Sequence, residues 1–473
     1  MPVTVDVCVL GGGPGGYVAA LRAAALGASV ALVEADSVGG VCLVRGCVPS
    51  KAMLRSAEVY HLAVNAKAFG VTVSGVQADY PAIRARKDRI VGQLVRGVHG
   101  LLDAAGVTLV KGYGRLASPG VVEVDWGGGG DLLLASQIIV ASGSSSVMPP
   151  VPGTELPGVI DSDGAFALEE VPKRIVVAGA GAVGVEWATL FALLGSDVTL
   201  VEMLPSVVPN EDADVSKALR RILLQQGVKV HTGTRIDSIS KRRGGLRVTL
   251  AQNDDASEVS ATHVLMATGR RANVENLGLA SAGVAYTRDG IPVDGCMRTN
   301  QPNVFAVGDV TGNRLLAHVA SHQGVVAAEN ATGGSSVYRD GAVPACTFTH
   351  PEIASVGLTE ADARQQHGEV IVGRFPFQAL GRARAFGDTD GFVKVVAGAA
   401  HQELLGMHVI GPGASDLVAE GALAIQLKAT LGDLRETIHA HPTFPEATAE
   451  AAWAAINQPI HMPLQRVRAK ASE

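Results

Sequence analysis

Residues 5–16 read VDVCVLGGGPGG, an apolar run followed at once by a glycine-rich loop. The run predicts a buried strand, residues 17–26 predict a helix, and a second strand follows that ends at Glu34. A strand, a glycine loop, a helix and a strand with a terminal acid together form the dinucleotide-binding fingerprint. The N-terminal part of the chain is therefore predicted to be an α/β fold that binds a pyrophosphate where its helix begins.

The residues of this loop have separate roles. Gly11 permits the tight turn, Gly13 lets the backbone approach the pyrophosphate, and Gly16 lets the helix pack closely against the strand. Glu34 is expected to accept hydrogen bonds from a ribose diol. Cys8, inside the strand, is expected to be a small core residue.

The same pattern returns in the middle of the chain. A strand at residues 174–178 leads into the loop GAGAVG, a helix and a second strand ending at Glu202. Gly11 and Glu34 are 23 positions apart, and so are the first glycine of the second loop and Glu202. Two copies predict two dinucleotides, and Glu202 favours NAD over NADP because a carboxylate repels a 2′-phosphate. The glycines expected to hold the second dinucleotide are Gly179, Gly181 and Gly184.

After the first copy, residues 39–51 read GGVCLVRGCVPSK. A loop that turns into a helix can bring Cys42 and Cys47 within the roughly 4.4–6.8 Å between Cα atoms that a disulfide requires. A static disulfide across so short a loop would stabilise the fold by only roughly 2 kcal/mol. Two thiols alone cannot complete a tetrahedral zinc site. A redox-active pair is therefore favoured over a structural disulfide or a metal site.

Two further stretches carry structural predictions. Residues 51–105 are expected to be helical, and the basic residues Arg84, Arg86 and Lys87 are interpreted as a solvated face. Alternating strands on either side of the four glycines at 127–130 predict a hairpin.

The C-terminal part of the chain has a different pattern of predicted strands and helices. From about residue 343, strands are followed by a helix at residues 414–427, which predicts a separate α+β domain. Near its end, residues 439–446 read HAHPTFPE, in which Glu446 is expected to hold the imidazole of His441 in one tautomer. A core or capping role would be the default for an isolated histidine. A thiol centre elsewhere needs a base, which favours the functional interpretation.

Size and composition exclude several classes of protein. The 473 residues predict two to four domains. A net charge of −6 gives no electrostatic reason to expect nucleic acid or an anionic membrane as a partner. Five cysteines, an odd number, argue against a secreted disulfide framework. The first strand begins too early for a signal peptide, and the apolar stretch 175–194 is interrupted by glycines and a glutamate. We expect a cytoplasmic protein.

Together these motifs resemble the flavin-dependent pyridine nucleotide–disulfide oxidoreductases. The resemblance covers essentially the whole length. It rests on the first glycine loop, GGVCLVRGCVPSK, GAGAVGVE, ATGRRANVENLGL, VFAVGDV, THPEIASVGLTE and HAHPTFPE. It implies two Rossmann-like domains, for FAD and NAD, and a C-terminal α+β dimerisation domain. The implied segments are 1–150 (FAD domain with the cysteine pair), 151–272 (NAD domain), 273–342 (second part of the FAD domain) and 343–473 (dimerisation).

The resemblance also implies roles for single residues. Cys42 matches the thiol that meets the substrate, and Cys47 matches the thiol that faces the flavin. Lys51 and Glu186 match an ion pair beside the flavin. His441, oriented by Glu446, matches the base that serves the disulfide of the other subunit in a homodimer. Asp309 matches the residue that binds the ribityl chain, and the other positions assigned to cofactor binding are Gly114, Ser142, Gly143, Gly269 and Ala317.

The implied activity is the oxidation of dihydrolipoyl groups by the cysteine pair and FAD, with reduction of NAD+ to NADH. The lipoyl group would be carried by a protein of a 2-oxo acid dehydrogenase or glycine cleavage complex. One alternative is an NAD(P)H-dependent disulfide or mercuric reductase, although no cysteine follows Cys346 and Glu202 disfavours NADP. The other is a flavin-binding protein that has lost catalysis.

The chain departs from the usual residues of the family near both reactive motifs. Val41 stands where the family usually has threonine, and Val44-Arg45 where it usually has Asn-Val. Pro445 lies between His441 and Glu446. The cation of Arg45 beside the thiols is expected to favour thiolate and so to alter the redox potential.

Overall fold

The computed structural model describes residues 3–253 and 255–463. The chain divides into two compact units. The first comprises residues 1–150, 159–171 and 265–339, and the second comprises residues 151–158, 172–264 and 340–473. Among the described residues, no helix is both long enough and apolar enough to cross a membrane. The division into four segments stays a prediction.

The first unit is organised around a mostly parallel sheet. Parallel pairing joins its central strands, and an antiparallel hairpin extends one edge. The hairpin turns at residues 126–129, which confirms the turn predicted at the four glycines. In spatial order the strands are β3 (Thr108–Lys111), β2 (Val30–Glu34), β1 (Val3–Leu10), β6 (Gly130–Val140), β5 (Val121–Asp125) and β4 (Tyr113–Ser118), and β17 (Val304–Ala306) pairs with the end of β6.

Both faces of this sheet are buried, as expected of parallel strands covered on two sides. In β1, Val7 and Val9 belong to one apolar cluster, and Cys8 and Leu10 belong to the cluster on the opposite face. Cys8 is fully buried, and burial raises the pKa of its thiol to about 12. This confirms that Cys8 is a core residue.

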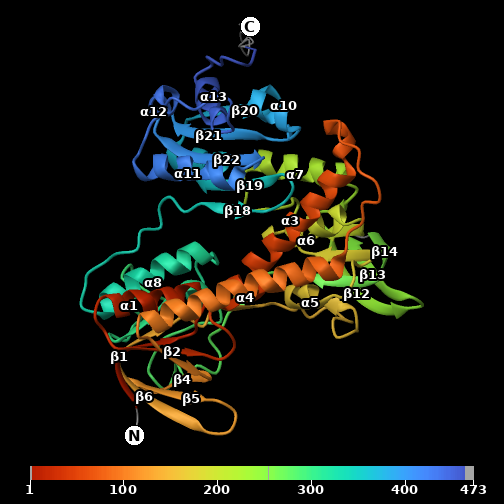
Figure 1. Ribbon diagram of the computed structural model, residues 1–473. Helices are drawn as coiled ribbons and strands as arrows, with labels where there is room; N and C mark the ends of the chain where they lie inside the picture. The colour runs from red at the N-terminus through yellow and green to blue at the C-terminus, as the bar shows by residue number, and fades with distance from the viewer. Residues whose placement is uncertain (1–2, 254, 464–473) are drawn as a thin grey trace. The chain divides into compact units, whose positions relative to one another are not determined.

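Helices α1 (Pro14–Ala25) and α8 (Ala317–Ala331) lie side by side on the first of these faces (Figure 1). The remaining elements of the unit are α2 (Gly40–Arg45), α3 (Cys47–Val64), η1 (Ala66–Phe69), α4 (Tyr80–Ala104), β7 (Ser144–Ser146), β8 (Val159–Ile160), α5 (Ser162–Ala167), β16 (Arg270–Ala272) and η2 (Gly308–Thr311).

The solvated basic face predicted at residues 84–87 is wrong for Lys87. This side chain is buried, pairs with Asp88 at 2.6 Å, and lies over the ring of Phe166. Arg86 is also engaged, because its guanidinium donates to the carbonyl oxygen of Ala52 at 2.8 Å. The long aliphatic stems of such residues pack against apolar surface while the charge finds a partner.

The second unit begins with the second glycine-loop fold. Its sheet has the strand order β11-β10-β9-β15-β8, with parallel pairing of β10 to β11 and β9, and α6 and α7 follow β9 and β10 in the chain. A three-stranded antiparallel sheet, β12-β13-β14, is inserted before β15. The bounds are β9 (Arg174–Ala178), α6 (Ala182–Leu193), β10 (Asp197–Val201), α7 (Ala213–Gln225), β11 (Lys229–His231), β12 (Arg235–Arg242), β13 (Gly245–Gln252), β14 (Asp255–Ala261) and β15 (His263–Met266).

The rest of the second unit is a five-stranded antiparallel sheet in the order β18-β19-β22-β21-β20. Helix α11 packs on β19 and β22, and α13 packs on β20 and β21 (Figure 1). The α/β class is thus confirmed, with two glycine-loop folds and a C-terminal α+β part. The bounds are β18 (Ala345–Thr347), β19 (Glu352–Gly357), α9 (Glu360–His367), β20 (Val370–Pro376), η3 (Phe377–Ala379), α10 (Gly381–Phe386), β21 (Phe392–Gly398), β22 (Leu404–Gly411), α11 (Ala414–Gln426), α12 (Leu431–Glu436) and α13 (Glu446–Ala455).

Candidate functional site

The first glycine loop has the geometry that the sequence predicts. Gly11 has φ +103°, and a Cβ at this position would lie 2.3 Å from the carbonyl oxygen of Ala141. Gly16 faces the same turn, because its Cβ would lie 1.8 Å from the Gly11 carbonyl oxygen. Gly13 precedes α1, whose first turn carries no side-chain cap. The N–H groups at this helix end are therefore available to an anion.

Glu34 fixes this loop from the end of β2. One carboxylate oxygen accepts a hydrogen bond from the N–H of Gly12 at 2.6 Å, and the other accepts from Asp36 at 2.7 Å. Each oxygen retains a second lone pair for a ribose hydroxyl. The acid thus holds the loop as well as standing where a ribose is expected.

The second glycine loop repeats these contacts. Gly179 has φ +97°, and α6 begins after Gly181 without a side-chain cap. Glu202 accepts from the N–H of Ala180 at 2.6 Å and from that of Leu204 at 2.8 Å. Gly184 is buried inside α6. The second loop therefore offers the same N-terminal helix end to an anion.

The other residues assigned to cofactor binding lie in the first unit. Gly114 in β4 packs tightly, since a Cβ there would lie 2.8 Å from a methyl group of Leu10. The hydroxyl of Ser142 donates to the carbonyl oxygen of Asn273 at 2.8 Å. Gly143 and Gly269 have φ +71° and +119°, and Ala317 is the first residue of α8. Their contact with a cofactor stays a prediction.

Asp309 belongs to a polar chain that the sequence did not reveal. It accepts a hydrogen bond from the hydroxyl of Ser144, a buried side chain of β7. Arg270 donates to that hydroxyl at 2.8 Å and to the Ser144 carbonyl oxygen at 2.6 Å. Arg270 thus supports the orientation of Asp309 through Ser144.

The two cysteines lie at the junction of two helices. Cys42 is inside α2, and Cys47 is the first residue of α3. Gly46 joins the helices, and a Cβ there would lie 2.8 Å from the carbonyl oxygen of Val41, so only glycine fits without a shift. The sulfur atoms are present as thiols that hydrogen-bond to each other, so the structure represents the dithiol form.

The electrostatics of the pair come from its immediate neighbours. The hydrogen bond with Cys47, reinforced by burial, raises the pKa of the Cys42 thiol, and the cation of Lys51 opposes this rise. Lys51 lies one helical turn after Cys47 in α3.

Arg45, between the two cysteines, forms ion pairs that the sequence did not reveal. Its guanidinium lies 2.9 Å from a carboxylate oxygen of Asp36 and 3.5 Å from one of Asp163. Lys51 is the cation that lowers the pKa of the Cys42 thiol. The expected effect of the Arg45 charge on the thiols is therefore weakened by two acidic partners.

The predicted histidine–carboxylate pair is present in the second unit. His441 Nδ1 lies 2.7 Å from Glu446 Oε1, and the N–H of Thr443 donates to Glu446 Oε2 at 2.6 Å. Partial burial alone would raise the pKa of Glu446, but these hydrogen bonds hold it below its ordinary value. A carboxylate only accepts, so Nδ1 carries the proton and Nε2 keeps its lone pair. Pro445 precedes α13 and does not prevent this contact.

His441 is also the more exposed member of the pair, with 77% of its side chain accessible in the single chain. The adjacent His439 is largely buried, and its Nε2 lies 2.9 Å from a carboxylate oxygen of Glu420 in α11. The segment that carries His441 is therefore held at both ends, and its ring remains accessible.

Glu186 is buried in α6, and its carboxylate accepts a hydrogen bond from the N–H of Phe348 at 2.9 Å. This contact joins the second glycine-loop fold to the segment between β18 and β19 of the C-terminal sheet. The ion pair of Glu186 with Lys51 stays a prediction.

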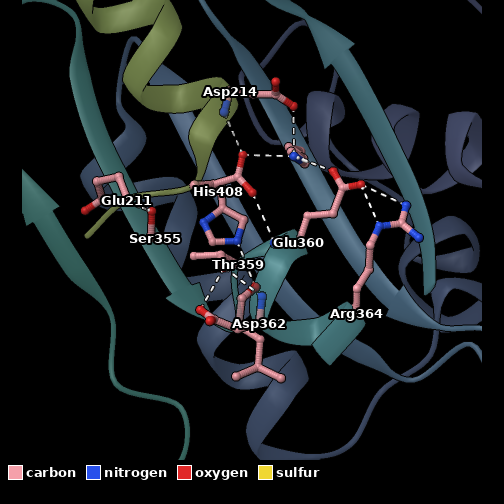
Figure 2. A network of polar contacts seen from close by, with 11 residues as sticks. Glu211, Asp214, Ser355, Thr359, Glu360, Asp362, Arg364 and His408 are labelled. Carbon is pink, nitrogen blue, oxygen red and sulfur yellow. Dashed lines mark hydrogen bonds and ion pairs between the residues drawn. The ribbon is translucent and has the colours of Figure 1, made fainter. Parts of the chain in front are cut away.

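A buried polar network in the second unit escaped the sequence analysis (Figure 2). Lys394 in β21 is only 2% exposed, and its ammonium lies 2.8 Å from each of three carboxylates. They belong to Asp212 and Asp214 at the start of α7 and to Glu360 at the start of α9. A charged residue within the apolar strand FVKVVAG is the signal that could have revealed a buried ion pair.

Comparison with protein families gives two matches. A family model described as pyridine nucleotide-disulphide oxidoreductase matches residues 5–324. The model of the dimerisation domain of the same family matches residues 343–452.

Curated proteins match over nearly the full length. The chain is 40% identical to a dihydrolipoyl dehydrogenase of Bacillus subtilis, covering 98% of this chain and 100% of that protein. It is 44% identical to a dihydrolipoyl dehydrogenase of Mycobacterium tuberculosis, covering 94% of this chain and 97% of that one.

Among solved structures, an HOCl-induced flavoprotein disulfide reductase from Escherichia coli aligns with a TM-score of 0.85 at 26% identity. The alignment covers 94% of this chain and 99% of that chain. Its Cu(II) complex aligns with a TM-score of 0.86, also at 26% identity.

Proposed function

The chain belongs to the pyridine nucleotide–disulphide oxidoreductase family, and from that premise we propose that it acts as a dihydrolipoyl dehydrogenase. It would oxidise protein-bound dihydrolipoyl groups through Cys42 and Cys47 and reduce NAD+ to NADH. Support comes from relatives at 40–44% identity and from a thiol pair with Lys51 beside it.

The residues fit both dinucleotides. Each glycine loop leads into a helix whose first turn lacks a side-chain cap, and each is held by an acid from the next strand. A Cβ at Gly13 or at Gly181 would meet no protein atom closer than 3.9 Å, so the space beside each is free for a pyrophosphate. We assign FAD to the first loop and NAD to the second, with Asp309 toward the ribityl chain. Bound FAD would supply a two-electron acceptor for the thiols.

The thiol chemistry would proceed by exchange. A substrate thiolate attacks the Cys42 sulfur of the oxidised pair, forming a mixed disulfide and releasing Cys47 as a thiolate. The second substrate thiol then attacks the substrate sulfur of the mixed disulfide. The substrate leaves as a disulfide, and the enzyme pair is left as a dithiol.

The proton of the attacking thiol would be removed by His441. With Nδ1 held by Glu446, Nε2 is the basic nitrogen, and the imidazolium formed is stabilised by the adjacent carboxylate. The pKa of a substrate thiol lies well above neutral, so a base raises the reactive thiolate fraction. The exposed ring is suited to serve the cysteine pair of a second subunit.

We further propose a homodimer whose active site is shared between subunits, with a lipoyl-bearing protein of a 2-oxo acid dehydrogenase or glycine cleavage complex as partner. The match to a dimerisation domain supports the dimer. A cytoplasmic setting is part of the proposal, because five cysteines, an odd number, argue against a secreted disulfide framework.

The observation that carries the proposal is the thiol pair on the α2–α3 junction with Lys51 beside it. The test is NADH formation from dihydrolipoamide and NAD+ by the purified flavoprotein. We expect Cys47→Ser to retain its flavin and lose turnover, since the disulfide can no longer form. Cys296→Ser, at a half-buried thiol remote in sequence, should retain turnover.

Full activity of Cys47→Ser would contradict the proposal. If wild type instead fails with dihydrolipoamide but consumes NADH with another disulfide, the disulfide-reductase alternative is favoured. An intact flavin that dithiols cannot reduce would indicate lost catalysis.

A further inference from the structure

Helix α2, which carries Cys42, contacts α3, α4 and α5 but is not part of the buried core. It is six residues long, none of its residues is buried, and no side chain caps its start. Gly39 precedes the helix with φ +97°, and Gly40 begins it with φ +55°. Glycine has no side chain that would restrict the backbone at these positions. Leu43 packs against an apolar cluster and is partly buried.

Arg45 supplies what the apolar core does not. At the last position of α2, its guanidinium contacts Asp36, which follows β2, and Asp163, in the first turn of α5. Asp36 is in turn joined to Glu34 through its N–H. We call the contacts of Arg45 with Asp36 and Asp163 the Arg45 bridge. It ties α2 to two segments on either side of it in the first unit.

The surroundings of Asp163 show that the bridge is part of a charged cluster. Burial raises the pKa of this carboxyl, Arg45 and Arg270 act against that rise, and Asp161 and Asp36 add to it. Arg270 is the residue that supports Asp309 through Ser144. The bridge thus lies in one electrostatic neighbourhood with the group assigned to the flavin.

The bridge matters most in the dithiol state. In the oxidised state a covalent bond holds α2 against α3. When that bond is open, Cys42 keeps its place beside Cys47 only through noncovalent contacts. Loss of those contacts lowers the effective concentration of one thiol near the other, which disfavours closure of the disulfide.

We propose that Arg45 is a positioning residue of the redox pair, which holds α2, and with it Cys42, beside Cys47 while the pair is reduced. The inference rests on the proposed function. It differs from a through-space effect of the Arg45 charge on the thiols, because the two predict opposite changes in the redox potential.

The test is the midpoint potential of the Cys42–Cys47 couple. The flavin-loaded protein is equilibrated with mixtures of reduced and oxidised dithiothreitol, thiols are trapped by alkylation, and the disulfide fraction is measured by mass spectrometry. We expect Arg45→Met to lower the equilibrium constant for disulfide formation about 3- to 10-fold. This raises the potential by about 15–30 mV, at 29.6 mV per tenfold change.

Arg45→Lys separates the bridge from the charge. Lysine keeps the positive charge but lacks the planar fork that contacts two carboxylates at once, so a rise smaller than that of Arg45→Met is expected. Arg115→Met is the matched control, because Arg115 forms an exposed ion pair with Glu123 at 2.7 Å in the same unit. It should leave the potential unchanged.

Several outcomes would overturn the inference. A lower potential in Arg45→Met with a wild-type value in Arg45→Lys would assign the effect to charge. Wild-type potentials in both variants would remove any role. Should Arg45→Met lose its flavin, Arg45→Lys decides between a raised and an unchanged potential. If the wild-type protein has no measurable Cys42–Cys47 couple, the proposed function is overturned as well. If the couple is measurable and its midpoint potential is the same in the variants, only the role of Arg45 is overturned.

Discussion

The two glycine-loop folds share their local geometry almost atom for atom. Gly11 and Gly179 have φ +103° and +97°. The terminal acid of each fold accepts two backbone hydrogen bonds, at 2.6 and 2.7 Å for Glu34 and at 2.6 and 2.8 Å for Glu202. The second loop residue of each fold also accepts from a later N–H, of Gly39 at 2.7 Å and of Val208 at 2.8 Å.

The folds differ in the segment that comes after the acid. In the first, the segment leading into the redox helix lies against the loop, because a Cβ built at Gly40 would lie 2.6 Å from the Cα of Gly13. In the second, a Cβ at Gly181 meets no protein atom within 4 Å. The apolar side chains around that loop are exposed, at 42% for Val183, 71% for Met203 and 50% for Leu204.

This difference shows how one loop can serve two purposes. A dinucleotide under a covering segment is retained, whereas one on an uncovered loop can leave. We infer that the first loop retains its cofactor and the second exchanges it. The cover of the first loop is also the segment that carries the cysteines, so holding the cofactor and positioning the thiols are the work of the same residues.

The residues that anchor the segments after the two loops differ as well, which gives the largest expected effect. Arg45 after the first loop is 43% exposed, whereas Lys394, which holds the start of α7 after the second loop, is 2% exposed. Lys394→Met should lower the free energy of unfolding by about 3–5 kcal/mol, because it leaves the buried carboxylate of Asp212 without its cation. Arg45→Met should lower it by less than about 1 kcal/mol. Urea unfolding followed by circular dichroism measures both.

The pH dependence of this difference has a definite sign. Although burial opposes it, contacts with three carboxylates raise the pKa of Lys394 above 10.5, so its contribution is full below that pH and is lost as the pH rises through the folded pKa. Lys394 also holds the pKa of Asp212 below its ordinary 3.8 despite burial, so that contribution is lost as the pH falls through the lower folded value. Equal destabilisation by the two variants at neutral pH would contradict the comparison.

Substitutions of Gly13 and Gly181 test directly whether the two loops differ in the segment that covers them. Gly13→Ala and Gly181→Ala should both fold, since neither Cβ meets a clash within the protein. Each methyl group would crowd a bound pyrophosphate at a cost of about 1–3 kcal/mol. Gly13→Ala should purify with less flavin, whereas Gly181→Ala should keep its flavin and show a higher KM for NAD+.

Flavin content by absorbance and steady-state kinetics distinguish the two. Loss of flavin from Gly181→Ala, or a changed KM for NAD+ in flavin-loaded Gly13→Ala, would reverse the assignment of the two loops.

The sequence was informative where the relevant contacts are local. The glycine loops, their acids 23 positions on, and the His441–Glu446 pair five positions apart all follow from short-range patterns. The ion pair of Arg45 with Asp163 could not be predicted, because the two residues are more than a hundred positions apart. Lys87 was misjudged for the same reason, since Phe166 packs against it. Periodicity locates a face but not the distant segment that covers it.

The smallest expected effect concerns Glu202 and Glu34, the acids that hold the two glycine loops. Glu202→Gln removes the charge that would repel a 2′-phosphate, which is worth roughly 1 kcal/mol between unit charges in a watery setting, or about fivefold. The ratio of kcat/KM for NAD+ to that for NADP+ should fall by this factor. The substitution also weakens the loop, because an amide oxygen can replace only one of the two carboxylate oxygens that hold Ala180 and Leu204.

Glu34→Gln breaks the matching contacts of the first loop without altering the charge beside the second, so it should leave the ratio unchanged and affect flavin retention instead. If Glu34→Gln moved the ratio and Glu202→Gln did not, the first loop would be the one that exchanges its dinucleotide.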